Sequence, residues 1–170
     1  MTDATGETAA RTRRPLDGLA TLILGLAGLA LVAMALVQAW QVFARYVLNA
    51  SPGWTEPVAL VLMSFAVMFG AAVGVRRETH FAFLNLREAL PGPMQGLLKS
   101  VSRLIAAAAG LGLTAMGGAL MIDDWSVPMA GAPAPSGLRF AALAVGGLLI
   151  LIFALERLIT GDLPPEPRED

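Results

Sequence analysis

The sequence lacks cysteine altogether and has a single histidine, His80. These absences exclude disulfides, thiolate chemistry and clustered Cys/His metal sites, so we expect no metal and no cofactor, and we interpret His80 as an interfacial residue. Charge is also scarce, because only 15% of the residues are charged and the net charge is −1. The 12 basic residues are too few and too scattered to form a phosphate-binding stripe, which argues against a nucleic-acid partner.

The chain is rich in long runs of apolar residues. Hydrophobic residues make up 56% of the 170 positions and the mean hydropathy is +0.67, outside the range of ordinary soluble domains. Four long runs carry no charge, and even the shortest, residues 140–155, is flanked by Arg139 and Glu156, whose side chains can reach the lipid headgroups. We therefore predict an all-α integral membrane protein whose four transmembrane helices occupy about residues 18–44, 56–76, 101–123 and 137–160.

A secretory signal peptide is the alternative interpretation of the first span. Arg13 and Arg14 resemble the basic region of such a peptide, and Ala33-Met34-Ala35 resembles its cleavage site. The apolar run continues past that point through Trp40, which favours an uncleaved membrane anchor.

The placement of Lys and Arg predicts how the spans are oriented. The two tails, the segment between the second and third spans and the span ends next to them hold ten of the 12 basic residues, whereas the two remaining segments and their adjoining span ends hold only Arg45 and Arg139. Basic residues concentrate on the cytoplasmic side of membrane proteins, and this bias alternates consistently through four spans. We therefore expect both termini in the cytoplasm and divide the chain into a basic cytoplasmic tail, a four-helix membrane domain and a second cytoplasmic tail, at residues 1–15, 16–160 and 161–170.

The segment between the second and third spans allows two interpretations. Residues 81–90 interleave aromatic and charged side chains, among them Phe81, Phe83 and Arg87, before the helix-breaking residues 91–93. A short amphipathic helix in the membrane interface would account for this pattern, and so would an ordinary cytoplasmic loop with hydrophobic contacts.

The spans offer no coupling site of their own. A transporter that works alone needs an ionisable side chain or a broken helix near the bilayer midplane, and the four charge-free runs contain neither an ionisable residue nor an internal proline. An enzyme would need acid–base or metal groups that converge at one depth, and the predicted topology separates His80 from Arg45 and Glu56. We therefore expect neither an enzyme nor a stand-alone transporter.

Polar residues gather at one end of the first span. Gln38, Gln41 and Arg45 follow i, i+3, i+7 spacing and share one face of the helix. Glu56 begins the second span and is expected at the same depth as Arg45, so an ion pair across the short loop is geometrically reasonable. The alternative is that each charge extends separately into the headgroups. This polar face is a candidate interface with a partner.

Other residues indicate how the spans sit in the membrane and pack. Trp54 is expected to anchor at the membrane interface. Gly70 and Gly74 form a G-x-x-x-G pair on the second span, and Ala106 and Gly110 form a similar small-residue pair on the third. Such pairs let helix backbones approach closely in lipid, where apolar burial gives no drive to associate.

The order and spacing of several sequence elements resemble one protein family. In chain order, these elements are Arg45-Tyr46, Trp54-Thr55-Glu56, Gly70-Ala71-Ala72, Arg76-Arg77 and His80. The pattern is similar to that of the small membrane subunit of tripartite ATP-independent periplasmic (TRAP) transporters, the DctQ-like family. The resemblance is specific over residues 45–80 and extends through the four-span layout over about residues 16–160.

The resemblance implies a division of labour. In that family a large membrane subunit holds the substrate and sodium sites, a periplasmic substrate-binding protein captures the substrate, and the small subunit supports the large one in the bacterial inner membrane. The chain would then be an auxiliary subunit in sodium-driven uptake of a small organic acid, a carboxylate, with membrane lipid as a further partner. The resemblance favours a docking or structural role for Arg45 and Glu56. Pro57, where the family often has a second acidic residue, and Pro133 and Pro135 depart from the pattern.

Two alternatives accompany this interpretation. The small subunit of a tripartite tricarboxylate transporter is also four-helical, but the Arg45-Tyr46 and Trp54-Thr55-Glu56 elements disfavour it. A stand-alone membrane scaffold or small exporter is the second alternative, and such exporters depend on a carboxylate inside the membrane that no span provides.

Overall fold

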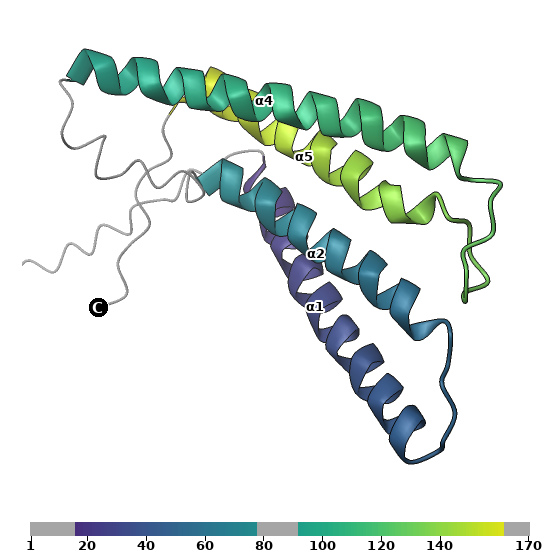
Figure 1. Cartoon of the computed structure of the whole chain (residues 1–170). Helices are drawn as coiled ribbons and strands as arrows, with labels where there is room; N and C mark the ends of the chain where they lie inside the picture. The colour runs from purple at the N-terminus through teal and green to yellow at the C-terminus, as the bar shows by residue number, and fades with distance from the viewer. Residues whose placement is uncertain (1–15, 78–91, 162–170) are drawn as a thin grey trace, which may run out of the picture.

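The computed structural model describes residues 16–77 and 92–161. These residues form four helices: α1 (Asp17–Tyr46), α2 (Thr55–Arg77), α4 (Gly92–Asp123) and α5 (Leu138–Thr160) (Figure 1). All four are long and apolar enough to cross a membrane, α4 over Gly96–Asp123. The prediction of an all-α protein with four membrane-spanning helices is therefore confirmed, whereas the side of the membrane on which the termini lie stays a prediction.

The ends of α1, α2 and α5 lie within two residues of the predicted spans, and α4 is the exception. α4 begins at Gly92, nine residues before the predicted residue 101. Pro93 is compatible with the first turn of a helix, because a backbone N–H at that position has no acceptor within the helix and proline lacks one. At about 1.5 Å per residue its 32 residues span about 48 Å, more than the roughly 30 Å of a hydrocarbon core. The predicted interfacial segment 81–90 and His80 lie outside the described residues.

The helices form two hairpins that meet through one helix each. α1 packs along α2, α4 packs along α5, and α2 packs against α5, so the spatial order is α1, α2, α5, α4. The membrane-length stretch of α5 is 44% buried, against 17% for α1, which makes α5 central and α1 peripheral. The Arg76 end of the bundle is the end at which α1 begins and α2 and α5 finish, and the loop end carries the connections 47–54 and 124–137. Figure 1 shows α1 diverging from α4 and α5 towards the loop end.

The largest buried cluster joins three helices close to the Arg76 end. It combines an alanine and a larger aliphatic residue from each of α1 and α2 with three large side chains of α5, and its members are Ala20, Ile23, Ala72, Val73, Leu149, Ile150 and Phe153. Small side chains on α1 and α2 let α5 insert Phe153, which is fully buried. The largest buried cluster shared by the two hairpins therefore lies beside the charged residues described below.

Glycines bring the backbones of α4 and α5 together. A Cβ atom on three of them would lie within 2.8 Å of a backbone nitrogen of the opposite helix: Gly110 against Leu151, Gly117 against Ala144 and Gly147 against Thr114. Side chains do not tolerate such distances, so the close approach of the helices requires glycine there. The predicted small-residue pair fits this interface, since Ala106 packs against Ala154 one turn from Gly110.

The loop end is closed by contacts between the two connections. Gly131 has a positive φ of 84°, and a Cβ atom there would collide with the carbonyl oxygen of Gly53. Within the 124–137 connection, the Met129 N–H donates to the Ala134 carbonyl at 2.8 Å, and Met129 is buried. The hairpins thus touch at the loop end through backbone rather than through charged side chains.

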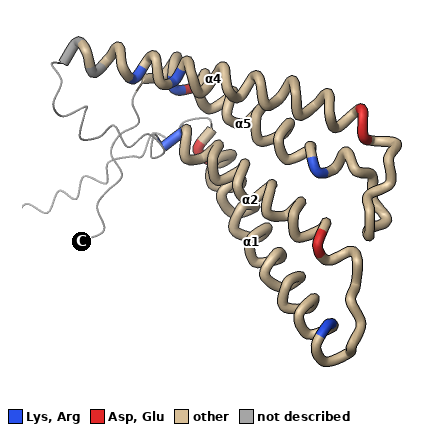
Figure 2. The backbone as a smooth tube through the Cα atoms, in the orientation of Figure 1, with Lys and Arg blue, Asp and Glu red and all other residues tan. Residues whose placement is uncertain are grey.

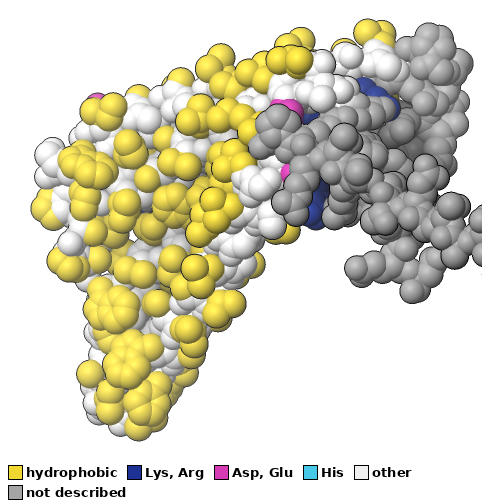
Figure 3. Space-filling model, turned by 180° about the vertical axis from the view of Figure 1, so that it is seen from behind, with side chains coloured by type: hydrophobic (Ala, Val, Ile, Leu, Met, Phe, Trp, Pro, Cys, Tyr) yellow, Lys and Arg dark blue, Asp and Glu magenta, His cyan; other side chains and the backbone are white. Residues whose placement is uncertain are grey.

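Charged residues lie near the ends of the helices, and the helical stretches between them carry none (Figure 2). Large apolar side chains cover the outside of these stretches, as Figure 3 shows for one face of the molecule. Leu29, Leu36 and Met116, for example, are 64%, 67% and 69% exposed. In a membrane, lipid chains or partner helices would cover this surface.

Candidate functional site

Three charged residues from three helices meet at the Arg76 end. Arg76 of α2 donates from Nε to Glu156 Oε2 at 2.7 Å and from Nη2 to Glu156 Oε1 at 3.0 Å, a two-bond pairing with α5. The same Nη2 donates to Asp17 Oδ1, in the first turn of α1, at 2.8 Å. We call Asp17, Arg76 and Glu156 the Arg76 cluster.

The Arg76 cluster is buried to different depths. The side chains of Arg76 and Glu156 are only 6% and 9% exposed, whereas that of Asp17 is 43% exposed. The Arg76 guanidinium also lies over the Phe153 ring, 5.6 Å from its centroid, where the electron-rich face of the ring favours a cation. Arginine suits this position because its planar group presents several donors at once, to two carboxylates and a ring.

Each member of the cluster continues the buried face of its own helix. Arg76 follows the fully buried Ala72 by four residues, Glu156 follows Phe153 by three, and Asp17 precedes Ala20 by three. Side chains three or four residues apart share a face of a helix, so the packed face of each helix ends in a charge at the same depth.

Sequence reasoning missed this cluster. It placed Arg76 at the end of the second span, as one of the basic residues that orient the chain, let Glu156 extend to the headgroups, and gave Asp17 no role. The available signal was the i+3 and i+4 continuation of apolar stripes into charged positions. That signal becomes specific only when the neighbouring helices are known.

The cluster is suited to hold helices together. Removing one member of a buried ion pair leaves an uncompensated charge and costs about 3–5 kcal/mol, whereas the net value of an intact pair is much smaller. Within the described ranges, no group of three His, Cys, Asp or Glu side chains is placed to hold a metal ion. We therefore interpret the Arg76 cluster as a tie between α1, α2 and α5.

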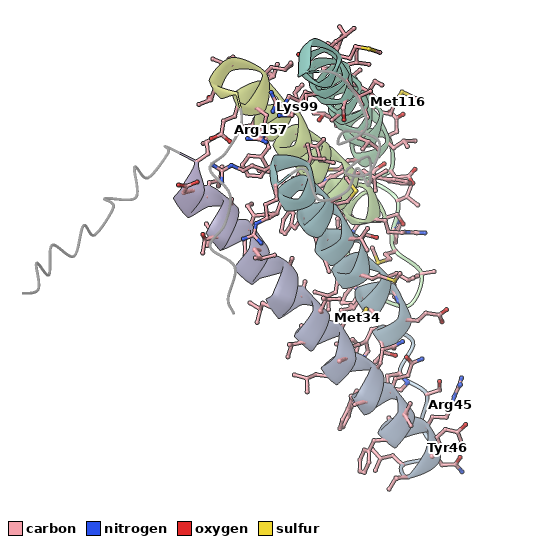
Figure 4. All side chains as sticks on the ribbon, turned by 90° about the vertical axis from the view of Figure 1, so that its left-hand side faces the viewer. Met34, Arg45, Tyr46, Lys99, Met116 and Arg157 are labelled. Atoms are coloured by element: carbon pink, nitrogen blue, oxygen red, sulfur yellow. The ribbon has the colours of Figure 1, made fainter. Side chains whose placement is uncertain are left out.

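A second buried cation lies one residue beyond Glu156. Arg157 is 3% exposed and donates from Nη1 to the carbonyl of Gly161 at 2.9 Å, just after the last turn of α5. Cations at a helix C-terminus are stabilised by the helix dipole and by the free carbonyls there. Figure 4 shows Arg157 at the Arg76 end of the bundle, in the same region as Lys99 of α4.

The predicted polar face lies at the opposite end and remains open. Gln38 and Arg45 are exposed and Gln41 is half-buried. Glu56 is exposed too, and no ion pair joins it to Arg45 within residues 16–77 and 92–161. Figure 4 shows Arg45 and Tyr46 extending from the last turn of α1.

The remaining predicted site residues are spread over α2 and its flanks. Trp54 is 40% exposed beside Thr55, which is fully buried and donates its hydroxyl to the Pro52 carbonyl at 2.9 Å. A Cβ atom on Gly70 would meet no atom within 4 Å, whereas Gly74 is buried. Trp54 therefore lies at the loop end, whereas Gly70 and Gly74 lie along α2, Gly74 two residues before Arg76.

Comparison with known protein families gives one finding. The model of the family described as tripartite ATP-independent periplasmic transporters, DctQ component, matches residues 34–162. The match begins in the middle of α1 and ends just past α5, so it covers well over half of the chain. A comparison with curated proteins gives no match.

Proposed function

We infer the function of this chain from one premise: it belongs to the DctQ family, the small membrane component of tripartite ATP-independent periplasmic (TRAP) transporters. On this premise we propose that the chain supports a large membrane subunit during uptake of a small organic acid. Uptake would be driven by sodium and would depend on a periplasmic substrate-binding protein. Both termini would lie in the cytoplasm, and the Arg76 end of the bundle would be its cytoplasmic end.

The observation that carries this proposal is the extent of the family match, which includes all of α2, α4 and α5. Two features of the molecule support a structural role. The charged groups that come together at the Arg76 end bind one another, as expected of a tie between helices. The helices also present apolar side chains on their outer faces, which is the kind of surface that another membrane helix can cover.

Co-purification tests the proposal. We expect the tagged chain, solubilised in mild detergent from membranes that also hold the other transporter components, to bring down a large, many-span membrane protein. An unrelated four-span protein with the same tag is the control. Recovery of the chain as an isolated, monodisperse protein that transports substrate by itself would refute the proposal.

The coupling and substrate parts of the proposal need a separate test. Cells that express all three components are expected to accumulate a radiolabelled carboxylate, and to stop when choline replaces sodium in the medium. Omitting the present chain should abolish uptake while leaving the binding protein able to bind its substrate. Uptake that persists without sodium would overturn the coupling, and uptake that persists without the chain would overturn the supporting role.

A further inference from the structure

We propose that the α1 tip, residues 38–46, is the surface on which a transmembrane helix of the large membrane subunit docks. The docking helix would present a carboxylate or amide oxygen to Gln38 and Arg45. This inference rests on the proposed function and adds the place and chemistry of the contact.

The first argument is that the α1 tip extends past its neighbour. The Asp17–Arg76 ion pair aligns the beginning of α1 with the end of α2, yet α1 has 30 residues and α2 has 23. The seven extra residues place the far end of α1 about 10 Å beyond the beginning of α2 along the helix axis. Figure 1 shows this overhang at the loop end. Its side chains are uncovered, with Val42 57% and Tyr46 79% exposed.

The second argument is that the uncovered surface carries polar side chains, Gln38 and Arg45, that the structure describes without a hydrogen-bond or ion-pair partner. Gln38 lies eight residues before Tyr46, about 12 Å along the axis, and is therefore level with the first turn of α2. On the proposed topology α2 begins at the membrane interface, so the Gln38 amide would lie at the boundary with the hydrocarbon, where an amide without a partner is less well satisfied than in water. A neighbouring helix with an acceptor or donor at the same depth supplies that partner.

The third argument is the mixture of side chains around the polar groups. Trp40 and Phe43 are 45% and 46% exposed, and their ring centroids lie 5.9 Å apart. Exposed aromatic rings next to an arginine are typical of the central residues of protein interfaces. Residues 38–46 include a cation and no acidic residue, so the complementary surface must supply the negative charge.

The same features disfavour the other occupants. A symmetric pair of copies meeting through the α1 tip would bring two Arg45 side chains together without an acidic residue of the tip to separate them. A soluble periplasmic protein would reach Arg45 but not Gln38, which lies about 10 Å deeper along the axis. A membrane helix can contact both.

Because the chain has no cysteine, single-cysteine cross-linking tests the proposal cleanly. Val42→Cys places the label between Gln38 and Arg45 on the same face and leaves both unchanged. Leu36→Cys is the control for direction, since Leu36 is 67% exposed and lies on a different face of α1, about 9 Å further from the tip along the axis. Each variant is labelled with a benzophenone maleimide in membranes that hold the large subunit, and then irradiated.

We expect Val42→Cys to give a cross-linked product with the mass of both subunits, several-fold more abundant than that from Leu36→Cys. Equal yields from the two variants would overturn the docking surface. So would a product with a second copy of the chain or with the binding protein, or labelling of lipid alone.

Two polar substitutions provide a second readout. Gln38→Leu and Arg45→Leu together are expected to lower the amount of co-purified large subunit about tenfold, the effect of losing one charge-assisted hydrogen bond at the contact. Unchanged co-purification would count against the inference. If the unaltered chain fails to recover the large subunit, the proposed function itself fails; if only the Val42→Cys preference is missing, the docking surface alone is wrong.

Discussion

The two ends of the bundle treat their charged residues in opposite ways. At the Arg76 end, Arg76 and Glu156 are buried together beside the main apolar cluster. At the loop end, Arg45 and Glu56 are exposed, and Gly53 and Gly131 bring the two connections into contact. Charged side chains are buried and paired where three helices converge, and they are exposed where α1 diverges from α5. The comparison teaches that the Arg76 end is completed by the chain itself, whereas we propose that a partner completes the loop end.

The largest effect should come from removing the central cation. Arg76→Ala leaves the Glu156 carboxylate buried without its partner, so we expect the free energy of unfolding to fall by about 3–5 kcal/mol. The measurement is the unfolding transition of the purified chain in detergent. Arg139→Ala, which removes an exposed arginine at the loop end, is the control and should change stability by less than about 1 kcal/mol. Equal losses of unfolding free energy in the two variants would contradict the proposal that only the Arg76 end depends on buried charge.

The two carboxylates of the Arg76 cluster should rank by burial. Glu156→Gln removes a charge that accepts two hydrogen bonds at 9% exposure, and we expect a loss of about 2–3 kcal/mol. Asp17→Asn should cost only about 0.5–1 kcal/mol, because a side chain that is 43% exposed is screened by solvent. Parallel unfolding experiments check the ranking. A larger loss for Asp17→Asn would mean that α1, rather than α5, is the main partner of Arg76.

Two glycines of α4 offer a matched pair away from both ends. Gly110→Ala forces a Cβ atom to within 2.7 Å of Leu151 N, so the helices must separate, and we expect a loss of about 1–2 kcal/mol. Gly112→Ala meets no atom within 4 Å and should be neutral or slightly stabilising, because alanine favours a helix. Thermal unfolding of both variants is the measurement. Similar effects would show that the close packing of α4 and α5 does not depend on glycine.

The smallest effect on stability should come from the loop end. Glu56→Gln changes an exposed side chain that makes no ion pair with Arg45, so the unfolding transition of the isolated chain should shift by less than about 0.5 kcal/mol. A charge-swapped pair, Arg45→Glu with Glu56→Arg, places each charge at the unfavourable end of its helix dipole, so it should cost the isolated chain about 1 kcal/mol more than Glu56→Gln. A stability loss that the swap rescues would reveal an ion pair that contradicts this comparison.

Hydropathy was enough to predict the four helices, because charge-free runs of membrane length have few alternatives. It did not predict where α4 begins, since proline is equally compatible with a loop and with the first turn of a helix, and Pro93 could belong to either. The family resemblance rested on residues 45–80 and agrees with the match over residues 34–162.

The packing inside the bundle was less predictable than its helices. Gly110 was identified from its spacing, whereas Gly117 and Gly147 form contacts that depend on the register between two helices. The Arg76 cluster was missed for the same reason, because a charge at a span end is equally compatible with headgroups and with a neighbouring helix. The expected Arg45–Glu56 pair assumed equal depths, and the overhang of the α1 tip separates the two residues along the helix axis.

Hydrogen–deuterium exchange of the chain, alone and in complex with the large membrane subunit, tests the central claim most directly. The α1 tip should exchange rapidly in the isolated chain and become protected in the complex, while the Arg76 end of α5 should be protected in both states. Protection gained only around Glu156, or no change at residues 38–46, would contradict the account.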